Sequence, residues 1–90
     1  MFSLSDTEAR GRTYAAARML AGLSQAELGE LAKLSAATVS NVERGEDARR
    51  TTTRSIKKAL NKHGVVVSFS PRNGIAAVTI RFDSTDDEDD

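Results

Sequence analysis

The stretch Leu23–Gly45, LSQAELGELAKLSAATVSNVERG, decides the fold of this 90-residue chain. Its first half begins at Ser24, whose hydroxyl can cap a helix. Apolar side chains then recur at Leu28, Leu31 and Ala32, a spacing that turns one face of a helix inward. We therefore predict a short helix over this half of the stretch.

The second half predicts another short helix over about residues 36–44. Ser35 is its N-cap candidate, Val39 and Val42 face inward, and Gly45 is placed to stop it. Two short helices joined by a tight turn form a helix-turn-helix.

The outward face of this second helix carries only small or uncharged side chains, those of Ala36, Ala37, Ser40 and Asn41. A helix that merely faces solvent usually carries Lys and Glu at such positions. A face that lies against the base edges of DNA needs short side chains with methyl groups or hydrogen-bonding tips. These four residues are our candidates for base contact.

Over about residues 10–65, the chain resembles the Cro/CI-type (XRE-like) helix-turn-helix regulators of phage repressors and antitoxins. The matching positions are Ser24-Gln25-x-x-Leu28 and Leu34-Ser35-x-x-Thr38-Val39-Ser40-x-Val42-Glu43-x-Gly45. The resemblance implies a mainly α fold, a lambda-repressor-like bundle of four to five helices. It also implies that helix 36–44 enters the major groove of DNA.

The resemblance assigns roles to individual residues. Ala36 and Ala37 would contact thymine methyls, and Asn41 would hydrogen-bond a base, most naturally adenine. Ser40 would lie beside them. Phosphate contacts would come from Gln25, Ser35, Thr38, Arg49 and Arg50. For the two arginines, simple solvation is the alternative.

Four positions of the resemblance bear on the stability of the domain. Arg18 stands where the family has an arginine that pairs with the glutamate of the recognition helix, here Glu43. The resemblance implies a partly buried pair that fixes the angle of that helix, and an ordinary surface salt bridge of little worth is the alternative. The chain departs from the family at Gly29, where Ala is usual, and at Lys33, where Gly is usual. Gly29 should cost about 1 kcal/mol of helix stability, and Lys33 needs a positive φ unless the turn is built differently.

A helix is predicted on the N-terminal side of the motif. Ser5 and Glu8 have the spacing of a capping box, and the helix runs to about residue 21 before Gly22. The core candidates of this region are Tyr14, Met19 and Leu23.

Another helix is predicted after the motif, over about residues 53–63, with capping hydroxyls offered by the threonines at 51–53. Its inward stripe is Ile56, Ala59 and Leu60.

Past Gly64 the apolar residues alternate with a period of two, around Asn73-Gly74. An Asn-Gly pair between alternating runs predicts a β-hairpin. With that turn, Arg72 lies opposite Ile75. The apolar pairs of one face are then Phe69 with Val78, Val67 with Ile80, and Val65 with Phe82.

A two-stranded hairpin is marginal in water. Its apolar face must therefore cover the helices, pair with a second chain, or do both. The chain is similar here to antitoxin regulators that place a C-terminal strand in an intersubunit sheet. Our candidate dimerisation residues are Val65, Val67, Phe69, Val78, Ile80 and Phe82. Leu20 and Leu31, apolar where the family tends to be polar, are candidates to join them.

The neutral overall charge hides a strong asymmetry. Residues 83–90, DSTDDEDD, hold six of the thirteen acidic side chains, so residues 1–82 carry thirteen basic and seven acidic groups, a net charge of +6. A basic body suits a polyanionic partner. We predict that the acidic segment is a disordered tail, because like charges repel and bury nothing.

Other function classes find no support in the residues. The chain has no Cys, no apolar run long enough to span a membrane, and no signal-peptide pattern, which favours a cytoplasmic location. His63 has no partners for a metal site, and the glycines form no phosphate loop. We expect no enzyme activity, no cofactor and no metal.

The sequence thus predicts a DNA-binding domain over residues 1–64, a dimerising hairpin over 65–82 and an acidic tail over 83–90. The predicted function is a homodimeric transcriptional regulator, most simply a repressor, on double-stranded DNA. The alternative is an antitoxin-type interaction module that also neutralises a toxin partner. A third possibility is a domain that keeps the fold without DNA binding, and the basic body argues against it.

Overall fold

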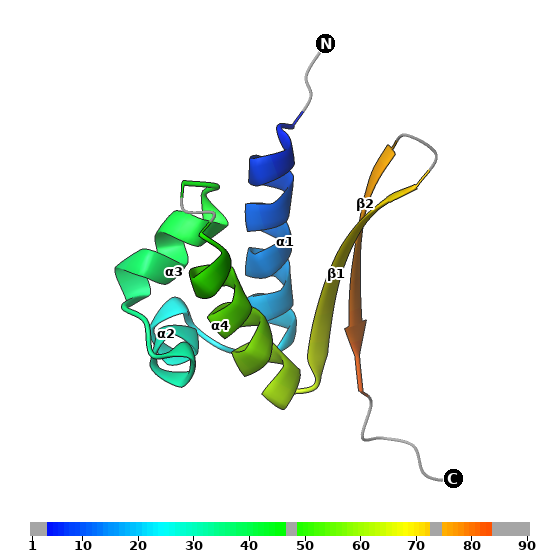
Figure 1. The fold of residues 1–90 in the computed structure, drawn as a ribbon. Helices are drawn as coiled ribbons and strands as arrows, with labels where there is room; N and C mark the ends of the chain where they lie inside the picture. Colours follow the sequence, from blue (N-terminus) through cyan, green and yellow to red (C-terminus); the bar gives the residue numbers. More distant parts are fainter. Residues whose placement is uncertain (1–3, 47–48, 73–74, 84–90) are drawn as a thin grey trace, which may run out of the picture.

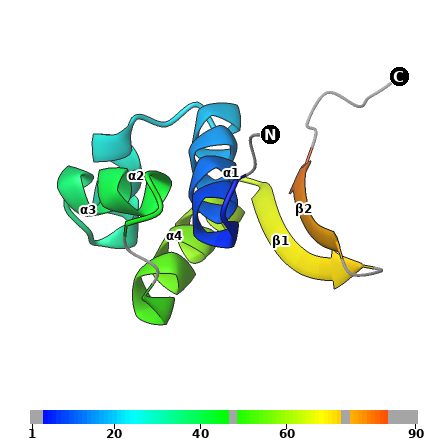
Figure 2. The ribbon, with the colours of Figure 1, turned by 90° about the horizontal axis from the view of Figure 1, so that it is seen from above.

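The computed structural model describes residues 4–46, 49–72 and 75–83, and these form four helices followed by two strands (Figure 1). The elements are α1 (Asp6–Leu20), α2 (Gln25–Ala32), α3 (Ala36–Glu43), α4 (Arg50–Lys62), β1 (Val65–Arg72) and β2 (Ile75–Phe82). The helices α2, α3 and α4 lie on one side of α1 and the hairpin lies on the other (Figures 1 and 2). The predicted fold class, a small helical unit followed by a hairpin, is confirmed.

Serine caps begin the first three helices. Ser5 and Glu8 form the predicted capping box, and Ser24 forms a second box with Glu27. The Ser35 hydroxyl accepts from the backbone N–H of Thr38 at 3.0 Å. In each box the serine backbone N–H donates to the glutamate carboxylate. These hydrogen bonds hold the pKa of Glu8 and of Glu27 below the ordinary glutamate value.

Helix α4 begins three residues earlier than its threonines predicted, at Arg50. Arg49 occupies the N-cap position without a side-chain cap hydrogen bond. The Thr53 hydroxyl instead donates backward to the carbonyl oxygens of Arg49 and Arg50, and Thr52 is buried. The predicted threonine cap is therefore wrong, because these hydroxyls are used inside the first turn.

The turn between α2 and α3 explains both departures from the family pattern. Lys33 ends α2 in the left-handed conformation, with φ of 61°. This is the positive φ predicted for a position where the family usually has glycine. Gly29 is buried, and a Cβ built on it would lie 2.6 Å from the carbonyl oxygen of Leu34. At this position the chain has no room for the alanine that the family pattern favours. Glycine therefore lowers helix propensity, as predicted, but it also allows the close approach of the turn.

The core forms where α1, α2, α3 and α4 meet. Its largest fully buried side chains are Leu28, Ile56, Leu60 and Val39. Of the predicted core residues of the first helix and its loop, Tyr14 is buried and Leu23 is partly buried. Met19 is 69% exposed, so its prediction was wrong. It comes two residues after the buried Ala17, which places it on the opposite side of α1.

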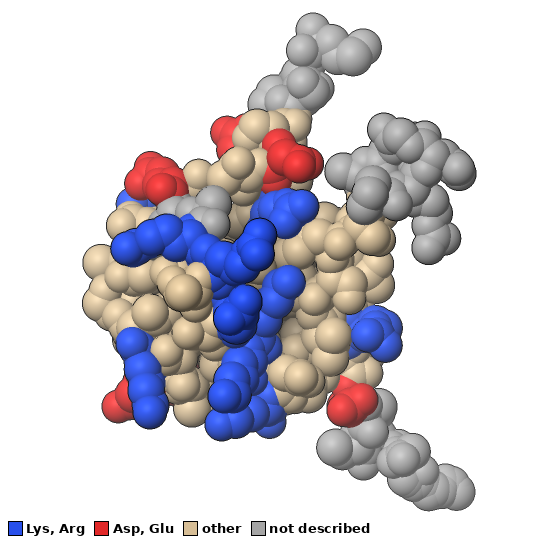
Figure 3. Space-filling view, in the orientation of Figure 1, with Lys and Arg blue, Asp and Glu red and all other residues tan. Residues whose placement is uncertain are grey.

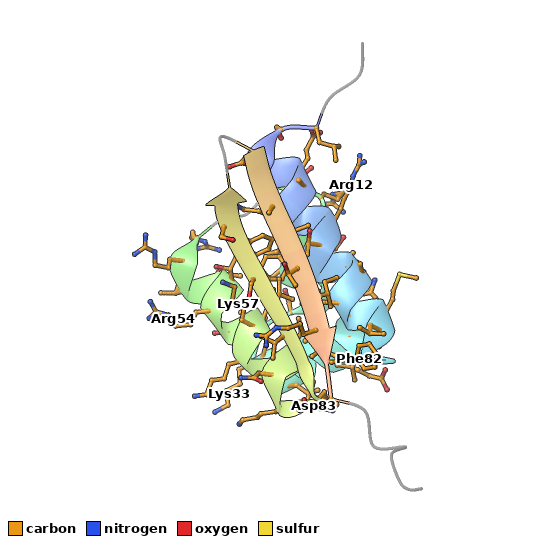
Figure 4. The ribbon with its side chains drawn as sticks, turned by 90° about the vertical axis from the view of Figure 1, so that its right-hand side faces the viewer. Arg12, Lys33, Arg54, Lys57, Phe82 and Asp83 are labelled. Carbon is orange, nitrogen blue, oxygen red and sulfur yellow. The ribbon has the colours of Figure 1, made fainter. Side chains whose placement is uncertain are left out.

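The hairpin has the predicted register, from Val65 opposite Phe82 to Arg72 opposite Ile75. The Asn73-Gly74 turn itself lies outside the described residues. Strand β1 contacts both α1 and α4, whereas β2 lies farther out and contacts α1. Consequently Val65 and Val67 are buried in the chain's own core, while Val78 and Phe82 are 49% and 62% exposed. Phe82 lies at the α1 side of the sheet, with Lys57 at the α4 side (Figure 4).

An aromatic contact joins the hairpin to the helices. The rings of Phe69 and Tyr14 meet edge to face with centroids 5.4 Å apart. The Arg10 guanidinium lies 4.9 Å from the Phe69 centroid and the Lys57 ammonium lies 5.3 Å from it. At the other end of the sheet, the Asp83 N–H donates to the Gly64 carbonyl at 2.9 Å.

Candidate nucleic-acid interface

The outer face of α3 is uncovered in the structure. Val39 and Val42 face the core and are almost fully buried. On the opposite side, Ala36 and Ala37 are exposed, and Ser40 and Asn41 are half-buried. The four residues predicted to contact bases therefore share one accessible face of α3, and α3 itself lies across α1 from the hairpin (Figure 1). Such a face has the width and chemistry to enter a major groove.

A buried carboxylate ties α3 to the two preceding helices. Glu43, the last residue of α3, is 9% exposed. The Arg18 Nε donates to Glu43 Oε2 at 2.7 Å, and Arg18 Nη2 donates to Oε1 at 3.2 Å. Gln25 Nε2 also donates to Oε1, at 2.9 Å. The fork of Arg18 is held in turn by the Leu23 carbonyl, which accepts from Nη1 at 2.9 Å. The orientation of α3 is thus set by bonds from α1 and from the start of α2.

The predicted phosphate-contact residues of the motif lie at helix N-termini. Gln25 is the first residue of α2, and its amide nitrogen is shared with Glu43, so one amide hydrogen and its backbone N–H remain for a phosphate. Ser35 and Thr38 begin α3, and their hydroxyl oxygens lie 2.9 Å apart. Both helix ends also present the positive end of the helix dipole.

A family model described as helix-turn-helix matches residues 15–65. The match covers more than half of the chain, and it includes all of α2, α3 and α4. The chain belongs to the helix-turn-helix family. This is a family of DNA-binding regulators of the Cro/CI type, and not one of enzymes. No curated protein matches the chain.

The basic side chains of this helix-turn-helix regulator gather along α4, where they run down one face of the molecule (Figure 3). The exposed cations of α4 are Arg50, Arg54, Lys57, Lys58 and Lys62. Among residues 4–46, 49–72 and 75–83, no carboxylate forms a salt bridge with any of these five. Arg49, which with Arg50 makes up the pair of arginines predicted to contact phosphate, is also exposed and precedes α4. The resulting positive field favours a phosphate backbone.

A cavity of about 400 Å³ opens beside this basic face, between α1 and the start of α4. Arg10, Arg50 and Lys57 supply its positive charges, and Tyr14 and Thr53 line it with hydroxyls. Burial raises the pKa of the Tyr14 hydroxyl, although Thr53 and Arg10 oppose the rise. The cavity extends the positive surface of α4 toward α1.

Sequence reasoning missed Arg44, which follows α3. Its guanidinium donates to Ser40 Oγ and to Asn41 Oδ1, two residues of the predicted base-contacting face. The signal was present in the sequence, because residues three and four apart on a helix are neighbours. The sequence pattern placed Arg44 only at the end of the predicted helix.

Metal sites and membrane-spanning helices are both absent from the part of the chain that the structure describes. No three His, Cys, Asp or Glu side chains there are grouped to hold a metal ion. No helix there is long and apolar enough to cross a membrane.

Proposed function

We propose that this helix-turn-helix regulator is a cytoplasmic, homodimeric repressor that binds a palindromic operator with α3 in the major groove. The observation that carries the proposal is the outer face of α3. It is accessible, it consists of small and hydrogen-bonding side chains, and a buried carboxylate holds it at a fixed angle. A single helix of this size reads only a few base pairs, so a two-fold dimer on two half-sites supplies the rest of the affinity.

The proposed contacts divide by chemistry. Ala36, Ala37, Ser40 and Asn41 face the base edges, where they supply methyl groups and hydrogen bonds. Gln25, Ser35, Thr38, Arg49 and Arg50 face phosphates, where they set register without reading sequence. Arg50 is the best supported of these, because it begins α4 and is exposed on the basic face.

For the dimer, we propose a narrower surface than the whole apolar face of the hairpin. Val65 and Val67 belong to the core of their own chain, and Phe69 and Ile80 pack against that core. The residues left to pair are Val78 and Phe82, together with the outer edge of β2, which among the described residues pairs only with β1. An open edge with exposed apolar side chains is a template for a second strand.

A protein partner is the second candidate function, and the exposure of Met19, Leu20 and Leu31 favours it. These side chains are 69%, 50% and 48% exposed on α1 and α2, and none of them is needed for the proposed DNA contacts. Isolated exposed apolar residues are common, but three on neighbouring helices suit a protein surface. A toxin reading frame next to the gene for this chain would support an antitoxin role.

The experiment for DNA binding is a footprint of the full chain on the DNA upstream of its own gene, with binding measured to that site and to random DNA. We expect a protected site with two half-sites about one helical turn apart. The double variant Ser40→Ala, Asn41→Ala should bind random DNA as before and lose preference for the site. Glu30→Ala, an exposed change on α2, is the matched control. Equal affinity of the unaltered chain for all DNA would refute the proposal.

The dimer is tested separately, by sedimentation of Val78→Lys and Phe82→Lys variants. Both positions are exposed within one chain, so the helices should remain folded by circular dichroism. We expect each variant to shift the monomer–dimer equilibrium toward monomer, and Thr79→Lys, on the opposite face of the same strand, to leave it unchanged. Unchanged dimers in both variants would place the interface elsewhere.

A further inference from the structure

The side chain of Arg44 is fixed by three neighbours at the end of the recognition helix. Its Nη1 donates to Ser40 Oγ at 2.6 Å and its Nη2 donates to Asn41 Oδ1 at 2.5 Å. On the other side, Glu46 accepts from Nη2 at 3.3 Å and from Nε at 3.4 Å. Arg44 is therefore held against the two residues of α3 that have hydrogen-bonding tips.

These bonds decide which groups α3 has left to offer. A guanidinium can only donate, so the Asn41 atom that faces Arg44 must be the amide oxygen. The amide nitrogen then points away with its two hydrogens. Ser40 likewise accepts through its oxygen and keeps its hydroxyl hydrogen. Among the described residues, neither the Asn41 nitrogen nor the Ser40 hydroxyl donates to another group.

The consequence is an outer face whose outward groups are hydrogen-bond donors, because the Asn41 amide oxygen is turned toward Arg44. Adenine presents an acceptor (N7) and a donor (N6) in the major groove, and a bidentate contact with Asn needs both the amide oxygen and the amide nitrogen to point toward the base. Guanine presents two acceptors, N7 and O6. To read adenine, Asn41 would have to turn its amide oxygen from Arg44 toward the base and so lose a charge-assisted bond, which is among the stronger kinds of hydrogen bond.

We propose that Arg44 sets the base preference of this regulator, by turning Asn41 into a donor that selects guanine in place of adenine. The inference rests on the proposed function, since it requires α3 to lie in the major groove. It replaces the adenine predicted from the donor and acceptor of an asparagine side chain. Arg44 is a positioning residue in this account, because it acts through Asn41 and Ser40.

The test begins with selection of binding sites from randomised DNA by the full chain. The base pair that Asn41 reads is the one at which Asn41→Ala loses discrimination. At this pair we expect guanine, and replacing it by adenine should weaken binding about tenfold, the lower range for one base contact. Removing the N7 acceptor with 7-deazaguanine should also weaken binding. Inosine, which keeps N7 and O6, is the matched control and should bind like guanine.

The decisive variant is Arg44→Met, which keeps a long side chain and frees the Asn41 oxygen. We expect its preference at that pair to move from guanine to adenine, with little change in thermal unfolding because the Arg44 side chain is 56% exposed. Glu46→Ala removes the other partner of Arg44, leaves the bond to Asn41 in place, and should retain guanine.

Two results would overturn the inference while leaving the proposed function intact. One is adenine at this pair with the unaltered chain. The other is an Arg44→Met variant that weakens binding to every sequence equally and lowers the salt dependence, which would make Arg44 a phosphate contact. Failure to enrich any sequence would instead reject the proposed function, and the inference with it.

Discussion

At the scale of single residues, Glu43 joins three helices through one carboxylate. One carboxylate accepts three hydrogen bonds from two side chains, and through them it connects α1, α2 and α3. Its side chain is 7% exposed and that of Arg18 is 16% exposed, so water cannot replace a lost partner. Removing one partner of a nearly buried pair leaves the other charge unsatisfied, which costs more than removing both.

We therefore expect Glu43→Ala and Arg18→Ala each to lower the free energy of unfolding by about 3 kcal/mol, at the lower end for buried pairs because Arg18 keeps some exposure. The double variant should lose less than the sum. Urea unfolding of all three variants measures this. The surface pair of Arg44 and Glu46, both more than half exposed, is the control and should give a coupling close to zero. Strict additivity at Arg18 and Glu43 would show that the pair contributes no coupling.

At the scale of elements, the turn between α2 and α3 makes opposite demands on two neighbouring positions. Lys33 holds a left-handed backbone that suits glycine, whereas Gly29 lies where the Leu34 carbonyl leaves no space for a Cβ. Helix propensity alone would favour Ala at position 29. The close approach of the turn overrides that preference.

Two substitutions should accordingly shift stability in opposite directions. Lys33→Gly should raise the free energy of unfolding by about 1 kcal/mol, because it removes the left-handed penalty of a side chain. Gly29→Ala should lower it by about 1–3 kcal/mol, the usual cost of overpacking. Thermal unfolding of each variant checks both signs. A stabilised Gly29→Ala variant would mean that the turn can move aside at little cost.

The capping boxes give the helices a dependence on acid. In the folded chain Glu27 accepts from the Ser24 backbone N–H, which lowers its pKa below the ordinary value of 4.5. A depressed pKa contributes stability that is present above pH 4.5 and is lost as the pH falls through the folded value. Glu27→Gln keeps an acceptor without the titration, so its unfolding should change less between pH 5 and pH 3. Glu30→Gln, outside the box, should behave like the unaltered chain.

The sequence predicted the elements that several local signals specify together. The hairpin register was correct because the Asn-Gly turn and the alternating apolar pattern required the same pairing. Ser5, Ser24 and Ser35 were recognisable as caps because a helical pattern follows each. The start of α4 was misplaced because a threonine can bond backward within a turn as readily as it can cap. Met19 was misplaced because the many alanines of α1 leave its buried face weakly marked, and one apolar residue more does not show which side is inward.

The candidate site was predictable to a smaller extent. The outward positions of α3 follow from helical spacing, and the pairing of Arg18 with Glu43 required the family resemblance. Helical spacing places Arg44 near Ser40 and Asn41, but the hydrogen bonds that it makes with them needed the structure, since a long side chain at a helix end has many possible partners. How far the hairpin covers the helices also depends on three-dimensional packing, which buried Val65 and left Phe82 exposed.

At the scale of the whole molecule, charge is divided between a basic body and an acidic end. The body of residues 1–82 carries a net charge of +6, and five further carboxylates follow Asp83. Of the predicted tail, residues 83–90, only Asp83 is among the described residues. The backbone N–H of Asp83 bonds the carbonyl of Gly64, so Asp83 lies near the C-terminal end of α4, where Lys62 adds positive charge.

Deleting residues 84–90 should tighten binding to random DNA at low salt, because the positive body then faces phosphates without competing carboxylates. The gain should shrink as salt screens both interactions. Specific binding should gain less, since base contacts have no equivalent in the acidic segment. Replacing the five carboxylates by their amides keeps the length and controls for it. Identical affinities with and without the segment would assign it no part in DNA binding.

The edge-to-face contact between Tyr14 and Phe69 also gives the chain an internal optical reporter. The sequence has one Tyr and no Trp, so its near-ultraviolet emission comes from a single ring. That ring is 4% exposed and lies where α1 and α4 receive β1. Lifting of the hairpin would expose the ring to an aqueous quencher while the helical signal in the far ultraviolet persists. Detachment of the sheet and melting of the helices can thus be followed separately, in the unlabelled protein.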